Sequence, residues 1–260
     1  MATSLQGTTV LVTGAGGGLG KVIATAYLEA GANVAICDIH EERLATARSE
    51  LEGTGRFAAF KADVTSEEAV TQLVADVAAR FGRLDILVSN AGMTDKFDPV
   101  GAVTKEAWDR VIGLNLTGSF LAFKAAVNAM EKQSPPGGTI IQIGSTASYH
   151  GMSSGVAYTA SKHGVAALVK STAGYYGAKG IYAIGLLLGG MIDTNIPDGF
   201  AALGGFNQEA FAQSISADFK PEMAIKTKDV AKYCVFLADR SVAESSNGSL
   251  ISFNKNYPMA

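Results

Sequence analysis

Three residues in the middle of the chain have types and spacing suited to acid–base chemistry. Tyr158 and Lys162 lie four residues apart, and Ser145 precedes the tyrosine by thirteen residues. On a helix, positions i and i+4 share one face, so the phenol and the ammonium would lie side by side. A free tyrosine has a pKa of about 10, and a neighbouring cation lowers that pKa towards the working range. The pattern predicts that Tyr158 exchanges a proton with a substrate whose oxygen is held by Ser145. Tyr and Lys at this spacing also occur on ordinary helix faces, so the rest of the chain decides between the two interpretations.

The elements that must position these residues follow from an alternation of short apolar stretches with helical ones. The apolar stretches lack polar alternation, which is typical of parallel strands covered by helices on both faces. The sequence therefore predicts a single-domain, doubly wound α/β fold of the Rossmann type over residues 1–260, with about seven strands. We expect strands at 9–12, 33–37, 57–61, 86–89, 139–143, 182–188 and 250–253. We expect helices near 18–29, 41–52, 66–81, 104–131, 155–178 and 228–238. The long, poorly periodic segment 190–221 is expected to form a lid over the substrate.

A glycine-rich loop follows the first expected strand and opens the first expected helix. Gly14, Gly18 and Gly20 fit the pattern T-G-x-x-x-G-x-G, with Leu19 inside it. Glycines allow a tight turn and a close backbone approach to a pyrophosphate at a helix N-terminus. The alternative is a flexible turn without a ligand, and the flanking strand and helix favour the dinucleotide.

Two aspartates at later strand ends extend the predicted cofactor site. Asp38 ends the second expected strand, where a carboxylate binds the diol of the adenosine ribose. A carboxylate there repels a 2′-phosphate, and the glycine loop holds no Arg or Lys, so NAD is favoured over NADP. The alternative for Asp38 is an ordinary surface residue. Asp63, followed by Val64, could lie near the adenine or could only cap a helix, and the sequence leaves both open.

Composition and charge restrict the other classes of function. A net charge of -3 without a basic cluster argues against nucleic acid as a partner. Apolar runs reach strand length only, so we expect no membrane span, and the polar N-terminus shows no signal peptide. Cys37 and Cys234 occupy apolar contexts and are expected to be buried thiols in a reducing, cytoplasmic compartment. The chain's histidines are scattered, so no metal site is expected.

These blocks together resemble the short-chain dehydrogenase/reductase family, in its compact single-domain branch, over nearly the whole chain. The matching blocks are residues 13–20, 63–64, 84–92 and 158–162, together with Asn115 and Ser145. The resemblance implies that Tyr158 is the acid/base, that Lys162 lowers its pKa and binds the nicotinamide ribose, and that Ser145 orients the reacting oxygen. It also implies that Asn115 holds a water in a proton relay. The residues implied to contact the cofactor further along the chain are Asn90, Ala91, Gly92 and Thr194.

The implied reaction is interconversion of a secondary alcohol and a ketone with NAD(H). The mixture of residues expected around the substrate indicates a fairly apolar small molecule, with Met93, Ser145, Met152, Tyr158 and Met191 as contacts. The turns at 184–194 and 254–256 depart from the family's pattern and leave the reacting groups in place. The alternative function is an NAD-binding sensor or scaffold without turnover. The resemblance also implies a homodimer or homotetramer built on the helices at 104–131 and 155–178.

Overall fold

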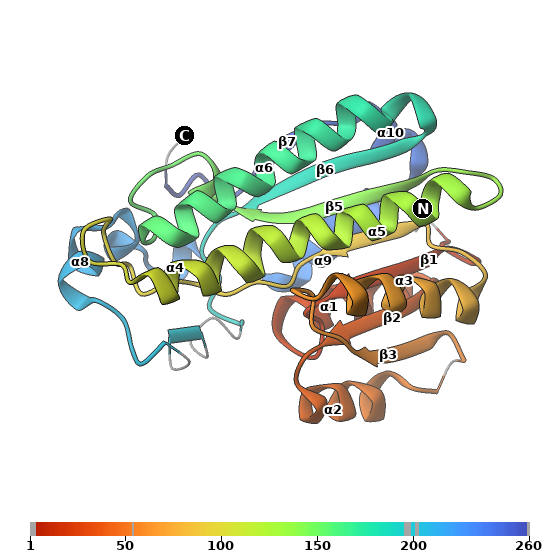
Figure 1. Cartoon of the computed structure of the whole chain (residues 1–260), viewed down its shortest axis with the longest axis horizontal. Coiled ribbons are helices and arrows are strands. Elements are labelled where there is room, and N and C mark those ends of the chain that lie inside the picture. The colour runs from red at the N-terminus through yellow and green to blue at the C-terminus, as the bar shows by residue number, and fades with distance from the viewer. Residues whose placement is uncertain (1–3, 54, 195–198, 201–202, 259–260) are drawn as a thin grey trace.

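The protein is built around one parallel β-sheet with helices on both faces (Figure 1). The computed structural model describes residues 4–53, 55–194, 199–200 and 203–258. The sheet has seven strands in the order β3-β2-β1-β4-β5-β6-β7, and every neighbouring pair is parallel. The strands are β1 (Thr9–Thr13), β2 (Asn33–Asp38), β3 (Phe57–Lys61), β4 (Ile86–Ser89), β5 (Gly138–Ser145), β6 (Ile181–Leu188) and β7 (Leu250–Phe253). The predicted doubly wound α/β fold is confirmed, and the order reverses direction between β1 and β4, where ligands bind in such sheets.

Two apolar cores, one on each face of the sheet, hold the layers together. Val10 and Val12 of β1 belong to the core beneath α1, α2, α9 and α10, while Leu11 between them belongs to the core beneath α3, α5 and α6. Successive strand residues point to opposite faces, so both faces can be buried only if both are apolar. The absence of polar alternation in the sequence is therefore explained. The helices covering the first face are α1 (Gly18–Glu29), α2 (Glu41–Leu51), α9 (Thr227–Phe236) and α10 (Arg240–Ser245). Those covering the second are α3 (Glu67–Phe81), α4 (Lys105–Ile112), α5 (Gly118–Lys132) and α6 (Val156–Tyr176).

The helix expected at 104–131 is interrupted by a π-helical turn. Thr104 caps its start by accepting from the Ala107 backbone N–H at 3.1 Å, and α4 then runs into the π turn Gly113–Thr117 before α5 begins. One-turn π segments inside α-helices are frequent at functional sites. The continuous helix Lys105–Lys132 is also long and apolar enough to span a membrane by composition, but half of its most apolar window is buried inside the protein. Burial of that kind is what a core helix shows.

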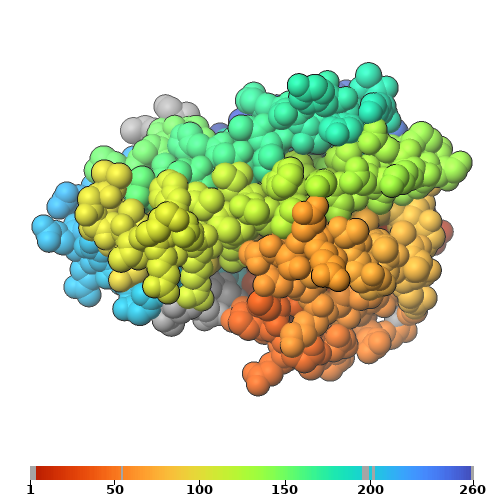
Figure 2. Space-filling view, viewed as in Figure 1, coloured from red at the N-terminus to blue at the C-terminus, as the bar shows by residue number. Residues whose placement is uncertain are grey.

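The segment expected to form a lid contains short helices. It includes α8 (Gln208–Gln213) and two 3-10 turns, Ile215–Asp218 and Pro221–Met223, while 195–198 and 201–202 lie outside the described residues. Figure 1 places α8 beside the loop that leads into α4, at one end of the molecule. In Figure 2 the blue atoms of this segment pack against the yellow atoms that precede and begin α4. The Asn207 backbone N–H donates to the Lys96 carbonyl at 2.8 Å, so the two segments are directly bonded.

Candidate functional site

The glycine loop between β1 and α1 presents the open end of a helix to a cavity. Gly17 is the N-cap of α1 and offers no side-chain acceptor, so the helix's first backbone N–H groups are left for an anionic ligand. Gly14 has φ +62°, and a Cβ there would lie 2.7 Å from the Ala91 Cα, so only glycine fits. Gly14, Gly18, Leu19 and Gly20 all line the cavity, which fits the residues a pyrophosphate requires.

Asp38 lies beside this loop at the end of β2. One carboxylate oxygen accepts from the Gly16 N–H at 3.0 Å and the other accepts from the His40 N–H at 3.0 Å. Its side chain is buried against the loop and lines the cavity, so it is not an ordinary surface residue. Arg43 lines the same part of the cavity, and its Cβ would lie 2.8 Å from a Cβ built on Gly16. The glycine loop itself has no cationic side chain. The fold brings Arg43, in the first turn of α2, to the cavity beside this loop.

The ends of β3 and β4 complete this wall. Asp63 and Val64 both line the cavity. Asp63 does not cap the next helix, because its Oδ1 accepts from the Thr65 N–H at 2.9 Å and the Thr65 hydroxyl at 2.7 Å. Ser66 is the N-cap of α3, accepting from the Ala69 N–H at 3.3 Å. The capping alternative for Asp63 is therefore wrong.

Asn90, Ala91 and Gly92 line the cavity directly after β4. The Thr13 hydroxyl accepts from the backbone N–H groups of Asn90 at 3.0 Å and Ala91 at 3.1 Å. The Asn90 side-chain amide donates to the carbonyls of Thr13 at 2.9 Å and Gly14 at 3.1 Å. These bonds tie the two neighbouring strand ends together and fix the glycine loop.

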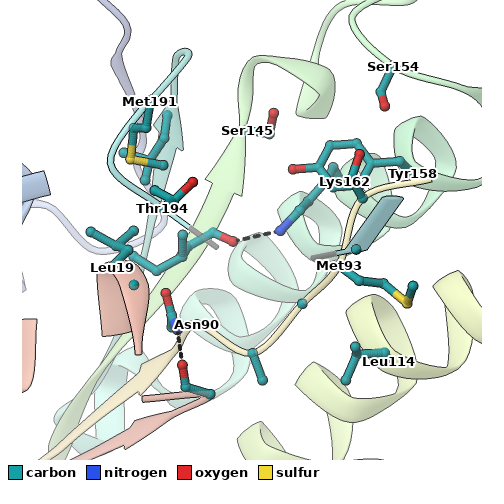
Figure 3. Close-up of a pocket in the computed structure, with 18 of the residues that line it drawn as sticks. Leu19, Asn90, Met93, Leu114, Ser145, Ser154, Tyr158, Lys162, Met191 and Thr194 are labelled. Atoms are coloured by element: carbon teal, nitrogen blue, oxygen red, sulfur yellow. Dashed lines mark hydrogen bonds between the residues drawn. The ribbon is translucent and has the colours of Figure 1, made fainter. Parts of the chain in front are cut away.

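Ser145, Tyr158 and Lys162 meet on the other side of the cavity (Figure 3). Ser145 ends β5, while Tyr158 and Lys162 lie one turn apart in the N-terminal half of α6. The Ser145 hydroxyl and the Tyr158 phenol both line this part of the cavity, and Ser145 acts to lower the pKa of that phenol. The Lys162 ammonium lies 5.5 Å from the centroid of the tyrosine ring and donates to the Ile143 carbonyl at 3.1 Å. The sequence thus correctly predicted that these three side chains share one space.

Burial shifts the pKa values of both ionisable groups in this trio. It raises the pKa of Tyr158 to about 12, opposed by the Ser145 hydrogen bond and reinforced by the negative charge of Asp95. Burial lowers the pKa of Lys162 to about 8, because the folded protein disfavours its charged form. The lowered tyrosine pKa expected from the neighbouring lysine is not seen in this structure, since desolvation dominates and the ammonium is bonded to Ile143. A neutral phenol is suited to donating a proton to a substrate oxygen.

Asn115 occupies the π turn and points inward. Its Oδ1 accepts from the Met93 N–H at 2.8 Å, and its Nδ2 donates to the Met93 carbonyl at 2.9 Å and the Ser161 hydroxyl at 3.1 Å. The side chain is 1% exposed. The amide thus connects the segment after β4 to α6, one residue from Lys162. The water relay implied by the resemblance stays a prediction.

The cavity has a volume of about 960 Å³ and extends from the glycine loop to an aromatic region. Met93, Met191 and Thr194 line it as expected. Met152 is not among the described lining residues: its backbone has φ +59°, and its side chain is 60% exposed. The phenylalanines that line it are Phe97, Phe200, Phe211 and Phe219.

Phe97 was not predicted from the sequence. It lies in the loop after β4 with φ +66°, and its ring packs edge-on against Phe211 at a centroid distance of 5.0 Å. A phenylalanine with positive φ is uncommon, and no sequence pattern predicts this conformation. Ser153, whose hydroxyl is buried without a hydrogen-bond partner, also lines the cavity and was missed.

Comparisons with known proteins agree with this arrangement. A family model described as short chain dehydrogenase matches residues 8–201. The chain is 42% identical over 259 residues to the short chain dehydrogenase/reductase dpchG of Colletotrichum higginsianum, covering 98% of this chain and 96% of that protein. It is 32% identical over 249 residues to 2-(S)-hydroxypropyl-CoM dehydrogenase 3 of Xanthobacter autotrophicus, covering 94% and 90%. A variant of the actinorhodin polyketide ketoreductase, solved with NADPH, superposes with a TM-score of 0.84 at 27% identity and covers 100% of both chains.

Proposed function

The chain belongs to the short-chain dehydrogenase/reductase family, and we propose that it is an NAD(H)-dependent oxidoreductase that interconverts a secondary alcohol and a ketone. The observation that carries the proposal is one cavity lined both by the glycine loop and by Ser145, Tyr158 and Lys162. Family membership itself makes the chain an oxidoreductase that uses a nicotinamide cofactor.

The protein's own contribution to the reaction is orientation and proton control. When bound, a nicotinamide cofactor would supply the hydride for ketone reduction or accept the hydride of the alcohol carbon in the reverse reaction. The Ser145 hydroxyl and the Tyr158 phenol line the same part of the cavity and can both donate to a ketone oxygen placed between them. As charge develops on that oxygen, Tyr158 transfers its proton, and in the reverse direction it takes the proton back. Lys162 holds a positive charge behind the phenol and stabilises the phenolate left after transfer.

The choice of NAD over NADP rests on Asp38. Its carboxylate lies against the glycine loop, where a ribose diol can donate to it and a 2′-phosphate would be repelled. Arg43 in the same wall offers a phosphate a cation, and the ketoreductase of similar structure was solved with NADPH. The buried carboxylate bonded to Gly16 and His40 is the stronger argument, and NADH should give the higher kcat/KM.

The substrate proposed is a fairly apolar small molecule. Two methionines and four phenylalanines line the cavity, and the rings of Phe97, Phe200, Phe206 and Phe211 form one contacting cluster. Such walls favour apolar surface, and aromatic rings stack on flat or cyclic groups. A ring ketone fits this description better than a phosphorylated one.

Replacing Tyr158 by Phe tests the proposal. We expect the variant to bind NADH with an unchanged Kd, measured by fluorescence titration, and to lose at least about a hundredfold in kcat, as for a missing acid/base. Turnover is followed at 340 nm with a panel of ring ketones and with NADH or NADPH. The matched control is Tyr233→Phe on α9, because this tyrosine packs on Phe236 and Phe253 and is not among the described residues that line the cavity. Wild-type protein that binds NADH but reduces no ketone would support a sensor or scaffold instead.

We also propose that the chain forms a homodimer or homotetramer. Phe120 of α5 is 45% exposed and Tyr175 of α6 is 78% exposed, and both border a surface hollow of about 400 Å³ between these helices. Apolar surface of this kind marks a protein interface. Light scattering coupled to size exclusion measures the assembly, and a monomer at micromolar concentration would contradict the proposal. The cytoplasmic location expected from the sequence stays a prediction.

A further inference from the structure

Asp95 is a buried carboxylate near the reacting groups that no step of the proposed reaction uses. Only 4% of its surface is exposed, and it does not line the cavity among the described residues. It lies in the loop between β4 and α4 but bonds to the start of α6, sixty residues further along the chain. Buried carboxylates must be matched by donors, so its partners indicate its role.

The partners of Asp95 are the first turn of α6. Its Oδ1 accepts from the Ser154 hydroxyl at 2.9 Å and from the Gly155 backbone N–H at 2.9 Å. Its Oδ2 accepts from the backbone N–H of Tyr158 at 2.8 Å. Gly155 is the N-cap of α6 and has no side chain to cap the helix. Asp95 therefore caps α6 from a distant loop and does so on the backbone of Tyr158 itself.

The contact between Asp95 and α6 leaves no spare room. A Cβ built on Gly155 would lie 2.6 Å from Asp95 Oδ2 and 2.7 Å from Oδ1. The backbone of Gly155 has φ -70°, which any residue can adopt, so the need for glycine there arises from the carboxylate. The sequence thus provides both the acceptor and the space for it.

The same carboxylate also holds the aromatic wall of the cavity. Asp95 Oδ1 accepts from the backbone N–H of Phe97 at 3.1 Å, two residues along, and Phe97 has φ +66°. This bond stabilises a conformation that is costly for a phenylalanine. Around it, the Asp98 carbonyl accepts from the Val156 N–H at 3.0 Å, and the Asp98 carboxylate accepts from the Asn207 amide at 3.0 Å.

We propose that Asp95 is a positioning residue that fixes where Tyr158 and Phe97 lie relative to each other. One side chain bonds the backbone of both, so the proton donor and the ring that packs on the substrate are held at a fixed separation. The inference rests on the proposed function, since it assigns Tyr158 the role of acid/base. Small displacements of a reacting group reduce turnover strongly, about a hundredfold for 1 Å.

Two variants test this role from opposite sides of the contact. Asp95→Asn keeps the shape but has a single acceptor oxygen, so either the Tyr158 N–H or the Phe97 and Gly155 N–H groups lose their partner. Gly155→Ala leaves Asp95 intact and displaces it by contact, and it carries the test if Asp95→Asn does not fold. The matched control is Asp239→Asn, since Asp239 caps α10 by accepting from the Ser241 and Val242 N–H groups. Weakening this helix cap should lower the stability of the fold without changing kcat or KM.

The measurement separates kcat from KM with two ketones of different size. Cyclohexanone and trans-1-decalone are reduced with NADH, and kcat is expressed per NADH-binding site found by fluorescence titration. We expect both test variants to lose about tenfold or more in kcat with each ketone, and KM to rise about threefold or more for decalone alone. The Kd for NADH should stay within about twofold, because the glycine loop is not involved.

Other outcomes overturn the inference. A kcat per site within about twofold of the wild type in both variants would show that Asp95 does not position Tyr158. An equal change of KM for the two ketones would refute the link to Phe97. An equal kcat loss in Asp239→Asn would reduce the effect to general stability. Loss of activity in Tyr158→Phe together with wild-type rates in Asp95→Asn would leave the proposed function standing and the inference refuted.

Discussion

Replacing Lys162 by Met should make the protein more stable while removing its activity. The lysine is 6% exposed, and burial lowers the pKa of its ammonium from 10.5 to about 8. Each pKa unit corresponds to about 1.4 kcal/mol, so holding the charged form inside the folded protein at pH 7 costs about 3 kcal/mol. Methionine fills a similar volume without a charge. It also gives up the hydrogen bond to the Ile143 carbonyl, worth about 1 kcal/mol, although the Gln142 amide still donates to that oxygen at 3.0 Å. The expected net gain in the free energy of unfolding is about 2 kcal/mol at pH 7.

The pH dependence of this gain has a definite sign. The folded pKa lies below the unfolded one, so between pH 10.5 and 8 the unfolded chain binds a proton that the folded protein does not. The wild type therefore loses stability relative to the variant as the pH falls through this window, and the difference is complete below pH 8. Well above pH 10.5 the lysine is neutral in both states, so the charge-dependent gain vanishes and only the lost hydrogen bond to Ile143 remains.

Urea unfolding of protein purified without cofactor measures the effect at pH 7 and at pH 9.5. The matched control is Lys170→Met, an exposed lysine two turns further along α6, which should change stability by less than about 0.5 kcal/mol at either pH. The Lys162 variant should also lose its ketone reduction. A variant less stable than the wild type at pH 7, or one whose gain is the same at both pH values, would refute the reasoning.

Three further predictions concern the cofactor end and the thiols. Asp38→Asn should raise the ratio of kcat/KM with NADPH to that with NADH by about tenfold, because one negative charge beside the ribose is removed; an unchanged ratio would remove Asp38 from cofactor selection. Gly14→Ala should weaken NADH binding at least about tenfold, since φ +62° and a Cβ 2.7 Å from the Ala91 Cα force the loop to move; a wild-type Kd in fluorescence titration would count against the glycine argument. Cys37 and Cys234 are fully buried and burial raises the pKa of each thiol to about 12, so neither should react with Ellman's reagent until denaturant is added; rapid labelling of the native protein would contradict this.

The sequence predicted the layers and most of the site because those features are periodic or local. Apolar runs without alternation indicate a sheet covered on both faces, and all the expected strands form within a few residues of their predicted ends. The Tyr158–Lys162 pair depends only on helical spacing, and the glycine loop only on its place between a strand and a helix. Ser145 and Tyr158 line the same cavity because the C-terminal end of β5 and the first turn of α6 both face it.

The features that the sequence did not predict depend on contacts between distant segments. Asp95 bonds residues sixty positions away, and nothing in its own neighbourhood identifies that partner. Arg43 reaches the cavity because α2 begins beside the glycine loop, although the loop itself carries no cation. A methionine such as Met152 is a residue type expected in an apolar pocket wall. Its backbone has φ +59°, however, and its side chain is exposed to solvent. The raised pKa of Tyr158 likewise depends on how much water the folded protein excludes.

The π turn at Gly113–Thr117 changes the rotational phase of the long helix that contains it. Each residue of an α-helix advances the helix by about 100°, and a π turn adds one residue without adding a turn. The apolar side chains after residue 117 are therefore rotated relative to those before 113, so that α4 packs on α6 while α5 packs on α3 and the sheet. The number of residues in this helix therefore determines which side chains of α4 and α5 face their packing partners. Removing one residue would turn Asn115 away from Met93, whereas many single substitutions on its outer surface would leave that pairing intact.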